Sequence, residues 1–142
     1  MGECTMKAHI LGAAMAALAA ALAAPAAAQQ PQSAIISTYH AAPGHQVALL
    51  KWLAERERIS AAAGVPASRL YVHQDGSGWD YLLIAPATTP AQDEAIEAAA
   101  KRLGLGAGPG VGIELRKHIA DHSDTFVSGP MSVADYLAAI GQ

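Results

Sequence analysis

The chain has 142 residues, a formal net charge of −3 at neutral pH and a single cysteine. It has no cluster of basic residues, so it is not expected to bind nucleic acid or an anionic membrane surface. Its length suffices for one domain of ordinary size.

The first 28 residues have the pattern of a secretory signal peptide. Lys7 precedes an Ala/Leu-rich apolar run that extends to Ala24, and Ala26 and Ala28 form a small-x-small cleavage motif. The apolar run is almost long enough for an uncleaved membrane anchor, which is the alternative. We expect cleavage after Ala28, which gives a periplasmic or secreted protein without stable membrane insertion.

Cleavage would also remove Cys4, the only cysteine. The mature chain could then form neither a disulfide nor a thiolate metal site, and its stability would depend on its apolar core. Residues 29–33 are polar and are expected to form a tether, and residues 34–142 are expected to form one domain.

The predicted elements alternate in the order strand, helix, strand, strand, helix, strand, followed by further helical segments. β-Branched and aromatic runs indicate strands, and apolar residues at helical spacing indicate helices. Strands are predicted at residues 34–40, 68–73, 79–85 and 123–127, and helices at about 45–63, 90–103, 113–121 and after Ser132.

Two helix starts carry a capping signature. Thr89 with Gln92, and Ser132 with Asp135, match the capping-box spacing. The last helix presents four apolar residues that we expect to dock on the core. These are Val133, Tyr136, Leu137 and Ile140.

The β-α-β-β-α-β order predicts an α+β, ferredoxin-like fold with a four-stranded antiparallel sheet in the order 4-1-3-2. Both main helices are then expected on one face, which leaves the other face bare. Residues 81–85 are largely apolar, so both faces of that strand require burial. Two sheets packed face to face predict a homodimer. The alternative is a monomer whose last helix covers the open face.

The chain resembles the dimeric α/β-barrel superfamily, which includes antibiotic-biosynthesis-type monooxygenases and stress-responsive barrel proteins. The resemblance is carried by a strand ending at Tyr39 and His40, the Pro43-Gly44 break, Gly64 after the first long helix, and the hairpin at 70–84. Haem-degrading members use an Asn, a Trp and an axial His, and this chain has no Asn. Other members use a His–Asp pair, for which His73 and Asp80 are the nearest analogue.

In this topology the ends of the four strands bring polar and aromatic residues to one rim of the sheet. The histidines among them are candidates for acid, base or ligand roles, and the alternative is that they are simply solvated. The catalytic candidates are His40, His73, His122 and Asp80, with Asp124 as a further carboxylate beside an imidazole. The ligand-binding candidates are Tyr39, His40, Tyr71, His73, Trp79 and Tyr81.

No metal or other cofactor is expected. His118 and His122 would share a face if both lay on the helix predicted at 113–121, which makes them weak metal candidates. Ile119 stands where a zincin has its glutamate, so the hydrolytic motif is absent. The glycine-rich segment 104–112 does not match the dinucleotide-binding pattern and is expected to be a loop.

Together these features predict an exported dimer that binds a small apolar or aromatic molecule in its barrel. One alternative is a cofactor-independent, monooxygenase-like or isomerase-like enzyme that uses a rim histidine. Another is a structural or stress-related protein whose barrel interior is filled by side chains.

Overall fold

The computed structural model describes residues 32–142 of the chain. The predicted signal peptide and most of the predicted tether lie outside the described residues. Within residues 32–142, no helix is long and apolar enough to cross a membrane.

The fold is built on a four-stranded sheet in which all neighbouring strands are antiparallel. The strands are β1 (Gln32–Ala41), β2 (Arg69–Val72), β3 (Tyr81–Pro86) and β4 (Ile119–Gly129), in the spatial order β2-β3-β1-β4. This is the predicted order 4-1-3-2, and the ferredoxin-like arrangement is confirmed.

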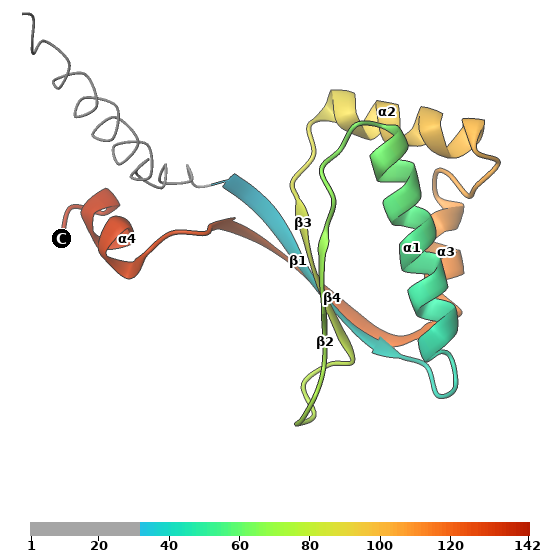
Figure 1. Cartoon of the computed structure of the whole chain (residues 1–142), viewed down its shortest axis with the longest axis horizontal. Helices are drawn as coiled ribbons and strands as arrows, with labels where there is room; N and C mark the ends of the chain where they lie inside the picture. The colour runs from blue at the N-terminus through green and yellow to red at the C-terminus, as the bar shows by residue number, and fades with distance from the viewer. Residues whose placement is uncertain (1–31) are drawn as a thin grey trace, which may run out of the picture.

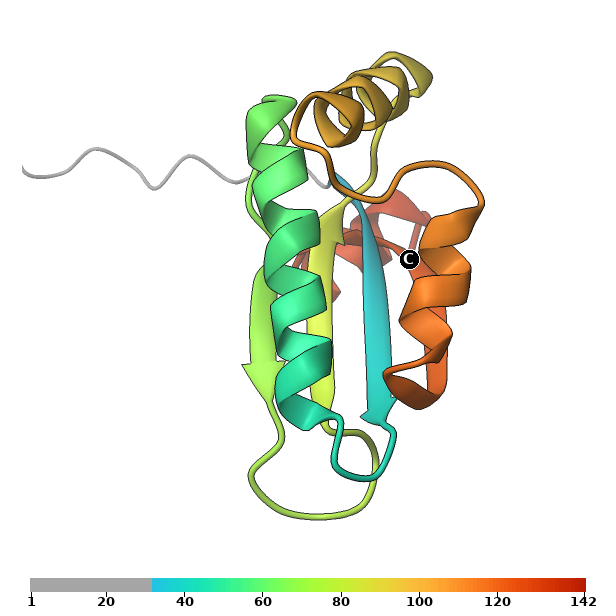
Figure 2. The ribbon, with the colours of Figure 1, turned by 90° about the vertical axis from the view of Figure 1, so that its right-hand side faces the viewer.

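The helices are α1 (Gln46–Ala62), α2 (Pro90–Arg102), α3 (Gly110–Arg116) and α4 (Val133–Ala139). α1 and α3 lie over one face of the sheet, and α2 lies across one end of α1 (Figures 1 and 2). α2 begins at the expected capping box, in which the Gln92 amide donates to Thr89 Oγ1 and the Thr89 amide donates to Gln92 Oε1.

The main core lies between α1 and the sheet. Leu49 and Leu53 of α1 pack on Tyr39, Ala41 and Tyr81, and Leu49 is completely buried. These strand residues share one face of the sheet because side chains alternate along a strand. The core therefore fixes which strand residues point toward the helices and which point toward the open face.

A second, smaller core joins the end of α1 to α2. It contains Ile59 of α1 with Ala99 and Ala100 of α2, all almost fully buried. The two alanines let the helix backbones approach closely. The contact between α1 and α2 therefore holds α2 at the end of the sheet. α3, rather than α2, lies beside α1 over the sheet face (Figure 2).

The boundaries expected between residues 113 and 127 are wrong. α3 ends at Arg116, and β4 begins at Ile119 rather than at Ser123. β4 pairs with β1 from Gln32 opposite Gly129 to Ala41 opposite Ile119. The long pairing satisfies the backbone hydrogen-bonding groups of β1. The gain from these hydrogen bonds outweighs the helical pattern of residues 119–121, which therefore belong to β4.

The expectation that the last helix docks on the core is also wrong. Its Val133, Tyr136, Leu137 and Ile140 are 78%, 55%, 43% and 52% exposed. Only three residues link α4 to the end of β4, a reach of about 10 Å, and Figure 1 shows α4 away from the body of the sheet.

The open face of the sheet is therefore not covered by α4. Ile36 on β1 lies opposite Ile84 on β3, and Thr38 lies opposite Leu82. Tyr71 of β2 also lies opposite Leu82 and is 48% exposed. The row is apolar apart from Thr38, and no helix in the described part of the chain covers it.

Candidate functional site

The inner pocket is a cavity of about 440 Å³ between the helix-bearing face of the sheet and α1, with a contribution from α3. Most of its wall is apolar. The apolar lining residues are Ile35, Leu50, Trp52, Leu53, Ala54, Leu70, Leu83, Ala85 and Leu115, and the polar ones are Ser37, Tyr39, Arg56, Glu57, Ser60, Ser68, His122 and Asp124.

One end of the inner pocket is polar because of the pairing of β1 with β4. Tyr39 lies opposite His122, and Ser37 lies opposite Asp124. The rings of Tyr39 and His122 are stacked, with centroids 6.0 Å apart and planes 13° apart. His122 Nε2 lies 3.7 Å from Asp124 Oδ2, so the imidazole and the carboxylate are neighbours at this end.

Tyr39 is the buried member of this polar end. Burial raises the pKa of its phenol, the charge of Asp124 acts in the same direction, and the Ser37 hydroxyl opposes the shift. The phenol is therefore neutral at physiological pH and can donate a hydrogen bond. The side chain of His122 is 37% exposed, which leaves it able to exchange a proton with solvent.

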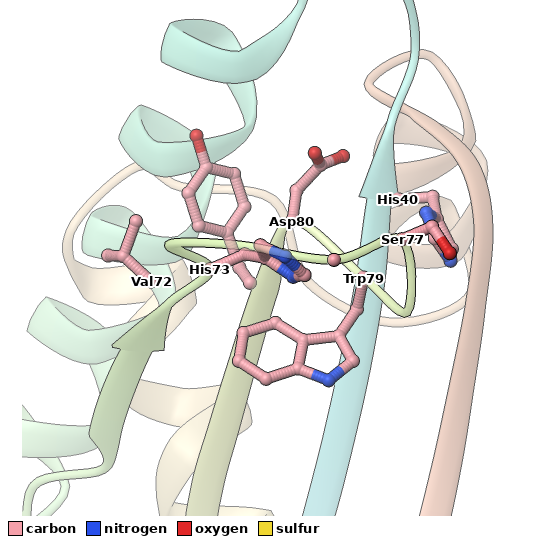
Figure 3. A pocket seen from close by; sticks show the side chains of 8 residues that line it. His40, Val72, His73, Ser77, Trp79 and Asp80 are labelled. Carbon is pink, nitrogen blue, oxygen red and sulfur yellow. The ribbon is translucent and has the colours of Figure 1, made fainter.

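The rim pocket is a second cavity, of about 270 Å³, at the end of the β2–β3 hairpin (Figure 3). It brings together several of the predicted site residues. The residues that line it are His40, Val72, His73, Gly76, Ser77, Trp79, Asp80 and Tyr81. The His73 ring meets the Trp79 ring edge-on, with centroids 5.2 Å apart.

The predicted pair of His73 with Asp80 does not form. Asp80 Oδ2 instead accepts a hydrogen bond of 2.7 Å from the amide of Ala41, and Figure 3 shows the carboxylate turned away from His73. The register of β1 with β4 shifts between His40 and Ala41, and Asp80 binds the Ala41 amide at this irregularity. Both ring nitrogens of His73 are buried, and neither has a hydrogen-bond partner in the part of the chain that the structure describes.

The predicted site residues are thus divided between two pockets rather than gathered at one opening. Tyr39 and His122 line the inner pocket, and His40 and His73 line the rim pocket. Tyr71 lines neither of these pockets and lies on the open face. Roles in binding or catalysis for these residues stay predictions.

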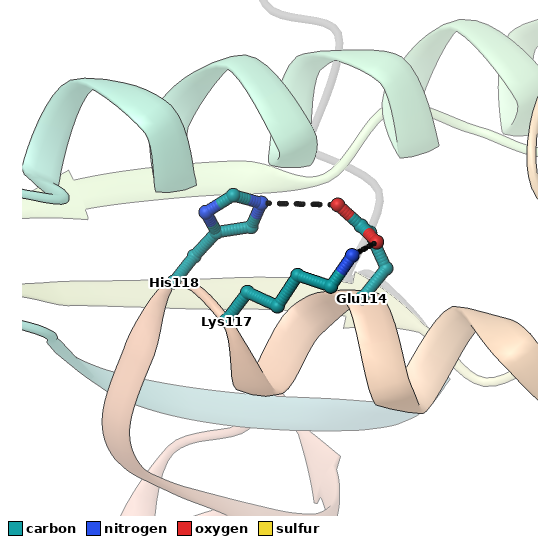
Figure 4. Close-up of polar contacts among 3 residues, drawn as sticks. All are labelled: Glu114, Lys117 and His118. Carbon is teal, nitrogen blue, oxygen red and sulfur yellow. Dashed lines mark hydrogen bonds and ion pairs between the residues drawn. The ribbon is translucent and has the colours of Figure 1, made fainter.

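The shared helical face expected for His118 and His122 does not exist. His122 belongs to β4, and His118 precedes that strand. His118 Nε2 instead lies 3.7 Å from Glu114 Oε1 (Figure 4). A hydrogen bond from Lys117 lowers the pKa of Glu114. Among residues 32–142, no three or more His, Cys, Asp or Glu side chains are grouped so that they could hold a metal ion.

Sequence reasoning missed the role of α1 in forming a pocket. Trp52 of α1 packs against the main core and also lines the inner pocket, and Arg56 lines the same pocket. The available signal was their spacing of four residues, which places a cation next to an aromatic ring on a helix. The Arg56 guanidinium carbon lies 5.5 Å from the centre of the Trp52 ring.

No protein-family model matches the sequence, and no curated protein matches it. Solved structures that are similar include a dimeric ferredoxin-like protein of unknown function from Thermobifida fusca, with 9% identity and a TM-score of 0.47 over 74% of this chain and 97% of that one. A Nitrosomonas europaea protein of unknown function has 15% identity and a TM-score of 0.43, over 72% and 93% of the two chains. A protein named provisionally as an antibiotic biosynthesis monooxygenase, from Chloroflexus aurantiacus, has 24% identity and a TM-score of 0.36, over 72% and 98%. At these identities the similarity concerns the fold alone.

Proposed function

We propose that the protein is an exported homodimer that binds a small apolar or aromatic molecule in the inner pocket. The observation that carries this proposal is the lining of that cavity, which is apolar along most of its wall and has polar groups on the β1–β4 pair and on α1. Such a combination is typical of sites for small organic ligands, because the apolar wall supplies affinity and the polar groups fix orientation.

The positions of the side chains support an aromatic ligand in particular. Leu50 and Trp52 of α1 and Leu83 of β3 all line the pocket, and a flat ring can pack against such side chains. Tyr39 can donate a hydrogen bond at the polar end, and His122 can donate or accept one. A hydroxyl or carbonyl group on the ligand would find a partner there.

The open face of the sheet supports the homodimer. An antiparallel sheet can expose one face to water when that face is polar. Here the open face carries Ile36, Leu82 and Ile84 in one connected row, and the described chain does not cover it. A second copy can cover the same row on its partner, which is the arrangement of a two-fold symmetric interface.

Labelling with 5-fluorotryptophan tests where a ligand binds, because Trp52 and Trp79 are the only tryptophans and each lines a different pocket. Addition of 2-naphthol is expected to shift the ¹⁹F signal of Trp52 in a saturable manner and to leave that of Trp79 in place. The variants W52F and W79F assign the two signals. A shift of the Trp79 signal alone, or of neither signal, would overturn the proposal.

A second candidate function is proton transfer on the bound molecule. It is favoured by the position of His122, which lies beside Asp124 and against the Tyr39 ring. The imidazole would remove a proton from a phenol or a carbon acid, and the carboxylate would stabilise the imidazolium formed. Proton transfer of this kind is what a cofactor-independent isomerase-like enzyme carries out, whereas a monooxygenase-like enzyme would also need O2 to oxidise the carbanion or phenolate that is formed.

Proton transfer predicts exchange of carbon-bound hydrogen in a simple carbon acid. The protein is expected to accelerate deuterium incorporation from solvent at the α-carbons of 2-tetralone, as followed by ¹H NMR. H122Q should reduce the accelerated rate by about 10²-fold or more, while H40Q, in the rim pocket, should leave it unchanged. Acceleration that persists in H122Q would exclude this histidine as the base.

A further inference from the structure

Arg56 lines the inner pocket and has an unsatisfied side-chain nitrogen. Its Nη1 donates a hydrogen bond of 2.7 Å to the carbonyl oxygen of Gly106, and its guanidinium lies over the ring of Trp52. Its Nε is buried and has no hydrogen-bond partner among the described residues. The side chain is thus fixed by two contacts, and its Nε donor is not used by either of them.

The charge of Arg56 is also unpaired within residues 32–142. The ion pairs there involve Lys101, Lys117, His118 and His122, and none involves Arg56. Glu57 also lines the pocket, but it is exposed and is not paired with this guanidinium. A buried donor of a charged group without a partner is costly, so this site favours an anionic acceptor.

We infer that the ligand of the inner pocket is an organic acid with a flat apolar body, whose carboxylate is bound by Arg56. This inference depends on the proposed function, since it names the class of ligand for the same pocket. The planar guanidinium matches a carboxylate because Nε and an adjacent Nη can donate two parallel hydrogen bonds. The body of the ligand would lie along Trp52 and Leu83.

Electrostatics also set the orientation of this acid. The polar end of the pocket carries Asp124, whose negative charge repels a carboxylate. Arg56 attracts it, and the opposite end of the ligand then faces Tyr39 and His122. The ligand expected from this arrangement is an aromatic acid with its polar substituent, if it has one, directed toward the β1–β4 pair.

A pair of closely similar ligands tests the inference on the full mature chain. 2-Naphthoate and 2-naphthamide have nearly the same shape, and only the first carries a charge at neutral pH. Isothermal titration calorimetry is expected to show that wild type binds the naphthoate at least about tenfold more tightly. R56Q should reduce naphthoate affinity to the naphthamide level and leave naphthamide affinity within about twofold of wild type.

R102Q is the matched control. Arg102 lies on α2, does not line the inner pocket, and like Arg56 donates one hydrogen bond to a backbone carbonyl, that of Ala62. It should bind both ligands as wild type does. R56K keeps the charge but lacks the planar guanidinium, so it should retain only part of the preference for naphthoate over naphthamide. This variant tests the inference even if R56Q is poorly folded.

The outcomes separate this inference from the proposed function. Equal affinity of wild type for the two ligands, or equal losses in R56Q and R102Q, would overturn the role of Arg56. The proposed function would stand in either case if the Trp52 ¹⁹F signal still shifts with 2-naphthol. Absence of any Trp52 response to 2-naphthol, 2-naphthoate and 2-naphthamide would overturn both.

Discussion

Replacement of Leu49 by alanine is expected to lower the free energy of unfolding by about 2–5 kcal/mol. Leu49 is completely buried, and it packs with Leu53 on Tyr39, Ala41 and Tyr81 in the core that joins α1 to the sheet. The truncated side chain would leave a cavity that a helix packed on a sheet cannot easily close. A domain of this size has a total stability of about 5–15 kcal/mol, so the loss is a large fraction of it.

The measurement is urea denaturation followed by circular dichroism, and V47A is the control. Val47 lies two positions earlier on α1 and is 64% exposed, so its truncation should change the free energy of unfolding by less than about 0.5 kcal/mol. α1 also carries Trp52 and Arg56, so L49A should weaken naphthoate binding as well. A loss in L49A no greater than that in V47A would show that α1 is not held against the sheet as described.

Sequence reasoning identified the parts of the fold that depend on local signals. The capping box of Thr89 and Gln92 is formed by residues three positions apart, and the start of α2 is confirmed. Gly64 after α1 has a φ of +75°, the left-handed conformation that glycine adopts without strain at the end of a helix. The sheet order followed from element order and the handedness of crossovers.

The remaining boundaries depend on contacts between residues far apart in the chain. His122 was expected after a helix, but its position in β4 is set by pairing with Tyr39, which lies more than eighty positions earlier. The same pairing places Asp124 beside Ser37. The topology predicted that Tyr39, His122 and Asp124 lie near one rim, but no local pattern in residues 113–124 indicates the register that sets His122 opposite Tyr39.

Asp80 shows a different limit of sequence reasoning. The resemblance to the dimeric α/β-barrel superfamily suggested that it pairs with His73, and carboxylates often orient imidazoles in active sites. In the structure, the carboxylate instead accepts a hydrogen bond from the backbone amide of Ala41. An unpaired amide at a strand irregularity cannot be recognised from residue types, since every residue except proline carries one.

The open face of the sheet leads to the prediction with the largest effect on assembly. I84K is expected to convert the proposed homodimer to a monomer. Ile84 lies opposite Ile36 on one side and Arg69 on the other, in the middle of the open face. A lysine there would bury an ammonium group beside another cation, and a buried charge without a partner costs about 3–5 kcal/mol.

Two-fold symmetry doubles this cost, because each substitution occurs twice in one interface. The dimer dissociation constant is therefore expected to rise by at least about a thousandfold, which size-exclusion chromatography with light scattering would detect as a halved mass. In the monomer the lysine would face water, so the circular dichroism spectrum should be retained. V47K adds the same charge on the exposed side of α1 and should leave the mass unchanged. A wild-type chain that is monomeric at micromolar concentration, or an I84K variant that stays dimeric, would show that the apolar row on β1 and β3 is not where two copies meet.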